Sequence, residues 1–446
     1  MTKKIAMVSL GCSKNQVDAE IMAGLLEDKA YKIIEDCEDA DYIVVNTCGF
    51  IEAAKEESID TILDMAEFKK FGKAKGLIAT GCLSERYHEE LMESIPELDG
   101  IIGTGNYAKI VETIETLEKT GEKVVLYGGI DSPFDETLPR QLPQGTAIAY
   151  VKIAEGCDNH CTYCIIPKLR GKYRSRKPEN ILKEIRHLGD LGVEEIVLIA
   201  QDTTMYGCDL EGNWNLSKLL KEVDKIDQVS WIRLMYAYPE NIDHDLIETL
   251  KHAKRILPYL DIPIQHTEDR ILKNMGRRTS KAQILGLFET LRREIPDMVI
   301  RTTLIAGFPG ETEEEHQEML KTIKELQADK LGVFDYSREE GTPAGRMRNQ
   351  IDEETKKARQ EAAMDVQLEV SIQRMEKHVG KTMKTLVEEH TEDGFIGRTW
   401  MDAPEIDGIV EVSAIQRPPV GTLVDVLITE ALEFDLIGVL DYEFAE

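Results

Sequence analysis

The chain has 446 residues, 42% of them apolar, and a formal net charge of −29. The length indicates about two to four domains, and the absence of any apolar run of about 18 residues excludes a membrane-spanning helix. Such an acidic chain repels phosphate backbones, which disfavours nucleic acid as a partner except through a local basic groove. With eight cysteines and no recognisable export signal, we expect a cytoplasmic protein whose reduced thiols are available for metal.

The first 135 residues alternate strand-like and helical patterns, and three of the strand-like runs end in a cysteine. The runs are IAMVSLGC, DYIVVNTC and KGLIATGC, which end at Cys12, Cys48 and Cys82. The cysteines are 36 and 34 residues apart, about one βαβ unit each. Because parallel strands end at one edge of their sheet, we expect an α/β domain over 1–135 with the three thiols in one crevice. Coincidence is the alternative for this dispersed triplet taken alone.

Three further regions follow in the chain. A polar stretch containing Pro and Gly, 128–146, is predicted to be a linker. Over 143–375 six strand-like runs alternate with helical patterns, which predicts a partial (β/α)6 barrel, with a helical connector at 350–375. The last region, 376–446, has five short strand-like runs broken by Gly, Pro and Asp, typical of a small antiparallel β-barrel.

Cys157, Cys161 and Cys164 lie close together in EGCDNHCTYCIIP, after the first strand-like run of the central region. Three thiolates without a nearby fourth can hold three corners of a 4Fe-4S cube and leave one iron open. Inert buried thiols, a zinc site and a redox-active CxxC pair are the alternatives. Zinc prefers four ligands and the CxxC pair lacks a thioredoxin-like context, so the spacing favours an open cluster. Cys37 and Cys208 fit neither triplet and are expected to be ordinary thiols.

A cationic run follows this close triplet. It consists of Lys168, Arg170, Lys172, Arg174, Arg176 and Lys177. Either it is a solvated loop, or one or two of its side chains face the site and hold a carboxylate or phosphate.

The CxxxCxxC spacing after the first strand of a six-unit partial barrel resembles the radical S-adenosylmethionine superfamily. The resemblance implies that the fourth iron binds the amino and carboxylate groups of S-adenosylmethionine, and that one electron cleaves this cofactor to a 5′-deoxyadenosyl radical. The cofactor contacts that it implies are Tyr163, Gln201, Asp202, Gln265, Ile305, Gly307 and Glu311. Gln201 and Asp202 would face the methionine amino group. Gln265 and His266 would lie near the ribose, and the segment Ile305–Glu311 near the adenine. A helix cap at Asp202 and a simple turn at Gly307 are the alternatives.

Over essentially all of its length the chain resembles the methylthiotransferases, which join a three-cysteine amino-terminal domain, a radical S-adenosylmethionine domain and a β-barrel called TRAM. The resemblance is carried by SLGCSKNQVDAEIM, VVNTCGFI, ATGCLSERY and EGCDNHCTYCIIPKLRG. It implies domains at 1–135, 143–375 and 376–446, and a 4Fe-4S cluster on each triplet. The cluster on the dispersed triplet would hold the sulfur or methylsulfide, and the other would generate the radical. Two S-adenosylmethionine molecules would be consumed, and no catalytic side chain beyond the cluster ligands is implied.

Members of this family differ in substrate. One branch modifies an adenosine beside the anticodon of tRNA, and another modifies an aspartate β-carbon in the twelfth protein of the small ribosomal subunit. The first motif resembles the ribosomal-protein branch, since the tRNA branch more typically reads YGCQMN. Residues 376–446 also carry 16 Asp and Glu against 5 Lys and Arg, which suits a basic ribosomal protein or the assembled subunit and disfavours RNA.

We further expect an electron donor such as flavodoxin or ferredoxin, and no membrane partner. A tRNA methylthiotransferase that acts on isopentenyladenosine is the alternative within the family. A non-catalytic iron–sulfur protein for electron transfer or sensing is the alternative outside it.

Overall fold

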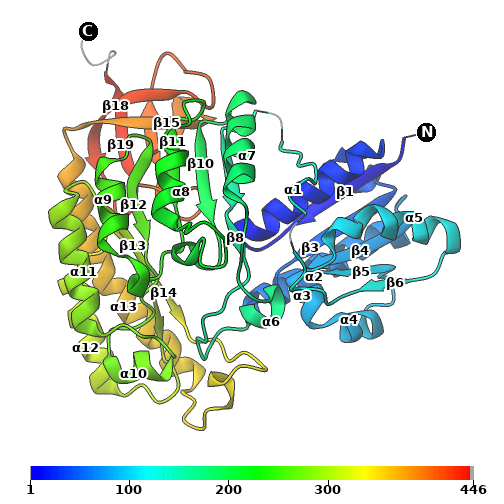
Figure 1. Cartoon of the computed structure of the whole chain (residues 1–446), viewed down its shortest axis with the longest axis horizontal. Coiled ribbons are helices and arrows are strands. Elements are labelled where there is room, and N and C mark those ends of the chain that lie inside the picture. The colour runs from blue at the N-terminus through cyan, green and yellow to red at the C-terminus, as the bar shows by residue number, and fades with distance from the viewer. Residues whose placement is uncertain (1, 134, 144, 442–446) are drawn as a thin grey trace. The chain divides into compact units, whose positions relative to one another are not determined.

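The structure is a computed structural model that describes residues 2–133, 135–143 and 145–441. Positions 134 and 144 of the predicted linker and 442–446 of the predicted terminal domain lie outside the described residues. The chain divides into two units (Figure 1). The first comprises Met1–Pro143, Ala154–Arg176 and Ser337–Gly345, and the second comprises Gln144–Ile153, Lys177–Tyr336 and Arg346–Glu446. Among the described residues, no helix is both long enough and apolar enough to cross a membrane.

In the first unit six parallel strands form one sheet in the order β2-β1-β3-β4-β5-β6. The strands are β1 (Lys4–Ser9), β2 (Lys32–Ile34), β3 (Tyr42–Thr47), β4 (Gly76–Gly81), β5 (Gly100–Gly103) and β6 (Val124–Leu126). β1, β3 and β4 confirm the three predicted strands, whereas the short β2, β5 and β6 were not predicted. The chain adds β2 on one side of β1 and β3 on the other, so the carboxyl ends of β1 and β3 flank a topological switch point.

Helices cover both faces of this sheet. One face packs against α1 (Ser13–Asp28), η2 (Tyr107–Lys109) and α5 (Ile110–Thr120), and the other against α2 (Glu52–Lys70), α3 (Cys82–Arg86) and α4 (His88–Ser94). η1 (Cys37–Asp39) precedes β3. The described part of the predicted linker lies along α1, where Arg140 Nε donates to Glu20 Oε2 at 2.7 Å and the Gln141 amide donates to the Glu20 carbonyl at 3.0 Å.

Three short elements complete the first unit. β8 (Ala154–Glu155) and β9 (Arg174–Ser175) pair in antiparallel fashion, and α6 (Ile166–Arg170) lies in the loop between them. This loop carries the close cysteine triplet.

The second unit contains the predicted partial (β/α)6 barrel. Its sheet is parallel, in the order β14-β13-β12-β11-β10-β7. The strands are β7 (Ile148–Lys152), β10 (Glu195–Ile199), β11 (Trp231–Leu234), β12 (Ile256–Asp261), β13 (Val299–Ala306) and β14 (Lys330–Asp335). The helices are α7 (Pro178–Asp190), η3 (Thr203–Met205), α8 (Leu216–Val223), η4 (Pro239–Asn241), α9 (His244–His252), α10 (Asp269–Asn274), α11 (Lys281–Glu294), α12 (Glu313–Leu326) and α13 (Glu353–Met375). All six predicted strands are confirmed. η5 (Ala344–Arg346) precedes α13, which packs against α12, β13 and β14 and so belongs to the barrel rather than only connecting domains.

After α13 and η6 (Glu376–His378), the chain forms a closed barrel in the order β15-β16-β17-β19-β18. The five strands are β15 (Thr382–His390), β16 (Gly394–Thr399), β17 (Val410–Ser413), β18 (Leu423–Ala431) and β19 (Leu436–Leu440), which confirms the five predicted strands. Four of the pairings are antiparallel, and β17 pairs with β19 in parallel.

Buried ion pairs tie this small barrel to the sheet of the same unit. Glu195, at the start of β10, accepts hydrogen bonds from Arg233 of β11 and Arg398 of β16, both at 2.7 Å. All three side chains are at most 2% exposed. Burial opposes ionisation of the carboxyl, but the two guanidinium groups hold the pKa of Glu195 below its usual range. Lys330 of β14 pairs with Asp402 at 2.6 Å in the same way.

Candidate iron–sulfur and cofactor sites

The dispersed triplet lies at the carboxyl ends of three neighbouring strands. Cys12 precedes α1, Cys48 follows β3, and Cys82 follows β4 as the first residue of α3. The last paired residues of β3 and β4 are Thr47 and Gly81, which lie opposite each other. Cys48 and Cys82 directly follow this pair, so they leave the sheet at the same level. Since adjacent parallel strands are about 4.8 Å apart, this register brings the strand ends together as the sequence predicted.

Glycines beside the cysteines permit this close approach. A Cβ on Gly11 would lie 2.8 Å from Cys48 Cβ and 3.2 Å from Cys48 Sγ. A Cβ on Gly49 would lie 2.8 Å from Leu83 Cα and 2.9 Å from the Cys82 carbonyl carbon. Any larger residue at either position would push two of the cysteine-bearing loops apart. These glycines were not singled out from the sequence, although a glycine adjoins each cysteine of the dispersed triplet.

Polar side chains hold the loops in place. Asn15 Nδ2 donates to the carbonyls of Leu10 at 3.1 Å and Thr47 at 2.8 Å, which joins the ends of β1 and β3. The Cys48 amide donates to Ser58 Oγ at 3.0 Å, and this hydroxyl donates back to the Cys48 carbonyl at 3.1 Å. The loop backbone is therefore fixed without use of the cysteine sulfurs.

The thiols of this triplet differ in burial. Cys12 is exposed, Cys48 is half-buried and Cys82 is buried. Burial raises the pKa of the Cys48 thiol, and it raises the pKa of the Cys82 thiol to about 12 against the opposing charge of Arg170. A buried thiol with such a raised pKa loses its proton when a bound metal ion compensates the charge of the thiolate.

The close triplet lies in the loop between β8 and β9. Cys157 and Cys161 are buried and Cys164 is half-buried, as is Tyr163. The Cys157 amide donates to the Gly171 carbonyl at 3.1 Å, and the Cys164 amide donates to the Cys161 carbonyl at 3.1 Å. These bonds close the loop around its three sulfur-bearing residues.

The donor sets suit open clusters better than single metal ions. Within the described residues, no three His, Cys, Asp or Glu side chains converge on a point that could hold one ion. A cube distributes its protein ligands over different irons, so its three thiolates need not converge on one atom. At the dispersed triplet the buried Ser13 and Ser84 hydroxyls lack a hydrogen-bond partner within the described part of the chain, and Gly11 lets its loop approach Cys48 closely. Three thiols at adjoining strand ends can ligate three irons of a cube, and hydroxyls beside them can donate to its sulfides, so the residues fit the group.

The cationic run is mostly engaged within the first unit. Lys168 Nζ donates to the Gly341 carbonyl at 2.9 Å, Arg174 donates to the Lys172 carbonyl, and Arg176 pairs with Glu136 at 3.2 Å. Arg170 is buried and binds carboxylates of its own chain. The carboxylates that Arg170 binds are Asp18 and Glu155 of its own chain, and Lys172 and Lys177 are exposed. That a side chain of this run faces the site and holds a carboxylate or phosphate stays a prediction.

The segment Ser337–Gly345 also contacts both triplet regions. Its Glu339 carboxylate, 3% exposed, lies 2.7 Å from Arg86 Nη1 and 3.3 Å from Lys55 Nζ. Arg86 Nη1 in turn donates to the carbonyl of Gly49, next to Cys48, at 2.9 Å. The Ala344 amide donates at 2.9 Å to the carbonyl of Thr162, within the close triplet. This segment therefore holds both cysteine-bearing regions, which the sequence did not indicate.

In the second unit, Gln201 and Asp202 follow β10 as predicted. The Asp202 side chain is fully buried and caps η3, accepting from the Thr204 amide at 3.0 Å and from the Thr204 hydroxyl at 2.5 Å. The helix-cap alternative for Asp202 is therefore confirmed. A contact of Gln201 or Asp202 with the cofactor amino group stays a prediction.

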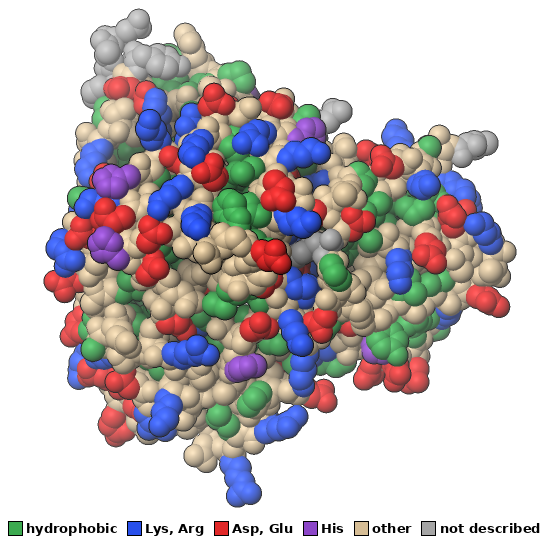
Figure 2. Space-filling model, in the orientation of Figure 1, with side chains coloured by type: hydrophobic (Ala, Val, Ile, Leu, Met, Phe, Trp, Pro, Cys, Tyr) green, Lys and Arg blue, Asp and Glu red, His purple; other side chains and the backbone are tan. Residues whose placement is uncertain are grey.

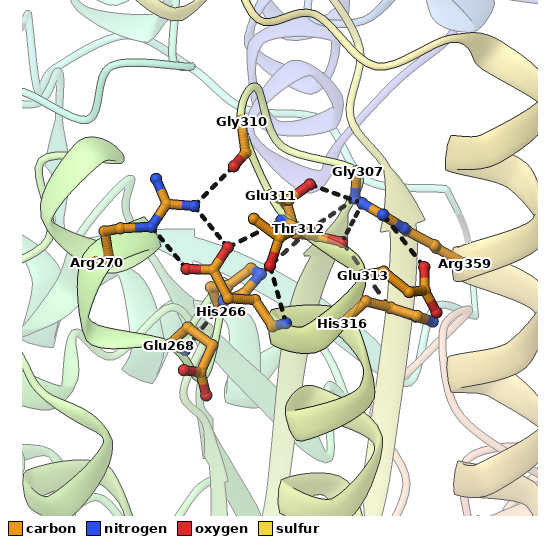
Figure 3. Close-up of polar contacts among 11 residues, drawn as sticks. His266, Glu268, Arg270, Gly307, Gly310, Glu311, Thr312, Glu313, His316 and Arg359 are labelled. Atoms are coloured by element: carbon orange, nitrogen blue, oxygen red, sulfur yellow. Dashed lines mark hydrogen bonds and ion pairs between the residues drawn. The ribbon is translucent and has the colours of Figure 1, made fainter.

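The ends of β12 and β13 are joined by a buried network (Figure 3). The Glu268 amide donates to His266 Nδ1 at 3.0 Å, which leaves the proton on Nε2, from which His266 donates to Glu311 Oε2 at 3.2 Å. The same oxygen accepts from the Gly307 amide at 2.9 Å, and Glu311 Oε1 accepts from Arg359 at 3.0 Å. Both ring nitrogens of His266 and both oxygens of Glu311 are thus engaged.

This network changes the interpretation of three predicted residues. Glu311 closes the turn that begins at Gly307, where φ is +74°, so the turn predicted as the alternative is present. The polar atoms of Glu311 and His266 are already hydrogen-bonded in this network, so these two side chains hold the segment Ile305–Glu311 in its turn. Gln265 has a φ of +73° and bridges to Leu304, so its backbone joins the ends of β12 and β13. Cofactor contacts through the backbone near Gln265, Ile305 and Gly307 stay predictions.

A parallel (β/α)6 sheet together with a CxxxCxxC loop defines a radical S-adenosylmethionine enzyme. The family model of the radical SAM superfamily matches residues 151–323, the TRAM domain matches 379–440, and an uncharacterized protein family, UPF0004, matches 4–103.

Solved structures show the same fold. The radical S-adenosylmethionine methyltransferase TsrM from Kitasatospora setae aligns with a TM-score of 0.57 at 15% identity, over 77% of each chain. The cobalamin-dependent S-adenosylmethionine radical enzyme OxsB aligns with a TM-score of 0.51 at 12% identity, over 82% of this chain and 56% of the other.

Curated relatives are much closer in sequence. The ribosomal protein uS12 methylthiotransferase RimO of Clostridioides difficile (strain 630) is 52% identical over 443 residues, 99% of this chain and 100% of the relative. RimO of Thermoanaerobacter sp. (strain X514) is 49% identical over 98% of this chain and 99% of the relative. The chain belongs to the ribosomal protein uS12 methylthiotransferase RimO family.

Proposed function

We propose that this chain adds a methylthio group to the β-carbon of an aspartate in ribosomal protein uS12. The observation that carries the proposal is the pair of three-cysteine sites, one at three adjoining strand ends and one in the loop between β8 and β9. Each has three thiols, which would leave one iron of a bound cube open. Membership of the RimO family supports uS12 as the substrate.

Each site has a distinct role in the proposal. Cys157, Cys161 and Cys164 hold the 4Fe-4S cluster that binds S-adenosylmethionine, and the dispersed triplet holds the second cluster. When bound, these groups supply a radical that removes hydrogen from the substrate carbon and the sulfur that takes its place. Cys82, Cys157 and Cys161 are buried, and bound substrate would have to cover the exposed Cys12, because water would quench a carbon radical before it met sulfur. In this proposal the dispersed triplet lies in the domain 1–135 and the close triplet in the domain 143–375. Residues 376–446 form the third domain.

The cofactor would be oriented by residues at the strand ends. Gln201 and Asp202 would face its amino group, Gln265 its ribose and Tyr163 the cluster region. The segment Ile305–Glu311 would pass the adenine with its backbone, because the Glu311 carboxylate is already bound to the Gly307 amide. A flavodoxin or ferredoxin would deliver the electron, and the enzyme would work in the cytoplasm beside its ribosomal substrate.

The outer surface of the terminal barrel supports a basic protein partner. Its exposed acidic residues are Glu389, Glu392, Asp393, Glu405, Glu411, Asp425, Glu430, Glu433 and Asp441. Of these, Asp425 alone is ion-paired within the described residues, with Lys384 at 2.8 Å. On the face of the molecule in Figure 2, acidic and basic side chains are interspersed and no large basic patch is visible. A phosphate backbone would meet repulsion at the barrel, whereas a lysine- and arginine-rich protein would be attracted.

The test is a mass measurement on the substrate. Reduced, reconstituted enzyme is incubated with S-adenosylmethionine, sulfide and uS12, and in parallel with isopentenylated tRNA. We expect a methylthio mass increase on one uS12 aspartate, 5′-deoxyadenosine as co-product, and unmodified tRNA. Methylthiolated tRNA would reject the proposed substrate, and absence of 5′-deoxyadenosine would reject the radical reaction.

Cysteine variants separate the two clusters. Cys157→Ala should abolish 5′-deoxyadenosine formation. Cys12→Ala should remove about half of the iron and leave cofactor cleavage intact. Cys37→Ala is the matched control, because Cys37 lies in η1, before β3, at the opposite edge of the sheet from Cys48. Loss of iron from the Cys37 variant, or full iron in the Cys12 variant, would contradict the assignment.

A further inference from the structure

Arg170 places a permanent positive charge beside the dispersed triplet. It is the last residue of α6, six residues after Cys164, and it is 3% exposed. Its Nη2 lies 3.5 Å from Cys82 Sγ and also donates to Asn15 Oδ1. The residue before it, Leu169, packs against Cys82. A guanidinium from the segment that carries the close triplet thus contacts a predicted ligand of the dispersed cluster.

Two buried carboxylates fix the direction of this guanidinium. Arg170 Nη1 lies 2.6 Å from Asp18 Oδ2 of α1 and 3.3 Å from Glu155 Oε2 of β8. Asp18 is 3% and Glu155 5% exposed. Because the guanidinium is planar and rigid, these bonds to Nη1 also set where Nη2 points, which is toward Cys82. Movement of the side chain away from the sulfur would leave two buried carboxylates without their cation.

We infer that Arg170 is a positioning residue that raises the reduction potential of the cluster on the dispersed triplet by donating a hydrogen bond to the Cys82 thiolate. This rests on the proposed function, because it requires that cluster. Reduction adds negative charge to the cluster and its ligands. A hydrogen bond to a ligating sulfur and a nearby cation both stabilise the more negative state, so the potential rises.

A purely structural role for Arg170 makes a different prediction. Its bonds to Asp18 and Glu155 would hold α6 against α1 whether or not it contacts the sulfur. In that case, replacement would affect folding or cluster retention but not the potential of the clusters that form. The potential is therefore the measurement that separates the two roles.

The experiment uses the full chain with Cys157, Cys161 and Cys164 replaced by alanine, so that the dispersed triplet carries the only cluster. Arg170→Gln, Arg170→Lys and Arg174→Gln are added to this parent, each is reconstituted anaerobically, and the cluster is titrated with dithionite under EPR detection. Arg174→Gln is the matched control, because it removes one positive charge from the same loop at a residue that donates to the backbone carbonyls of Lys172 and Arg170, while the Arg170 guanidinium itself is kept.

We expect Arg170→Gln to shift the reduction equilibrium at least tenfold toward the oxidised cluster, which is about 59 mV for one electron. Arg170→Lys should shift it less, and Arg174→Gln should leave it unchanged. Arg170→Gln with the parent's potential and iron content overturns the inference. If Arg170→Gln retains no iron, Arg170→Lys decides: a lowered potential supports the hydrogen bond and an unchanged one overturns it. A parent without iron would instead reject the second cluster and hence the proposed function.

Discussion

Replacement of Gly11 by alanine should remove the cluster of the dispersed triplet and leave the other cluster in place. Gly11 has a φ of +85°, and an added Cβ would lie 2.8 Å from Cys48 Cβ. The left-handed backbone costs an alanine about 1–2 kcal/mol, and the overlap about 1–3 kcal/mol more. The strain of about 2–5 kcal/mol falls on the contact between two cysteine-bearing loops and would displace Cys48 from its ligand position.

The assay is iron and sulfide per chain after anaerobic reconstitution, together with 5′-deoxyadenosine formation. The parent should bind about eight irons and the Gly11→Ala variant about four, with cofactor cleavage retained. Gly121→Ala is the matched control. Gly121 also has a positive φ, +68°, but its added Cβ would meet no atom within 4 Å. This control should lose only the stability that a left-handed backbone costs an alanine, and it should keep both clusters.

Two results would refute this reasoning. A Gly11→Ala variant with about eight irons would show that the close approach of Gly11 to Cys48 does not matter for ligation. A Gly121→Ala variant that also loses half its iron would show that the left-handed backbone alone destabilises the first unit, without any local effect at the cysteines.

Three other substitutions test ionisable side chains of the two units. Glu339→Gln removes the buried carboxylate that pairs with Lys55 and Arg86, so amide hydrogen exchange over 337–345 should accelerate at least tenfold. The control is Glu340→Gln, at an exposed position, which should leave the exchange rate unchanged. Equal exchange in both variants would contradict the role of the ion pairs. Glu195→Gln removes the carboxylate that pairs with the buried Arg233 and leaves Arg398 with Glu388 alone, so it should lower the unfolding free energy by about 3–5 kcal/mol, seen as a lower urea midpoint by tryptophan fluorescence; an unchanged midpoint would disprove this. Burial lowers the pKa of His378 to about 4, so between pH 6.5 and 4 the unfolded chain binds this proton more readily and stability falls as pH falls. His378→Gln should therefore reduce the loss of unfolding free energy between pH 7.5 and 5.5 by about 0.5–1 kcal/mol after allowance for exposure, seen as a smaller fall in melting temperature, and a parallel pH dependence in both proteins would contradict the assignment.

The sequence predicted strands where apolar runs were long and had a clear end. β1, β3 and β4 are six residues each, and a cysteine follows each strand within three residues. β2 and β6 are three residues long and incompletely buried, so neither their length nor their pattern separates them from loops. The switch point between β1 and β3 depends on β2, and it could therefore not be located from the sequence.

The side-chain networks were beyond sequence reasoning because their members are far apart in the chain. Arg170 and Asp18 are 152 residues apart, and Glu311 and Arg359 are 48 apart. A motif marks Glu311 as a candidate cofactor contact, but only packing shows that its carboxylate binds the Gly307 amide. Cysteine spacing was more informative, because thiols that follow parallel strands must meet at one edge of the sheet.

The acidic residues of the terminal barrel fall into two groups with different physical effects. Glu388, Asp402 and Asp407 face cations of their own unit: Glu388 pairs with Arg398 of the barrel at 2.7 Å, Asp402 pairs with Lys330 of β14 at 2.6 Å, and Asp407 lies 3.3 Å from Arg301 of β13. Such buried pairs are poorly screened by salt, and they fix the small barrel to the sheet of its own unit. The exposed acidic residues are mostly unpaired within the described residues, so their charge acts on whatever approaches. Composition counts both groups alike, but only the exposed group bears on the partner. Because this group remains strongly negative after the buried pairs are set aside, the electrostatic argument for a basic protein and against tRNA depends on the surface and not on the total.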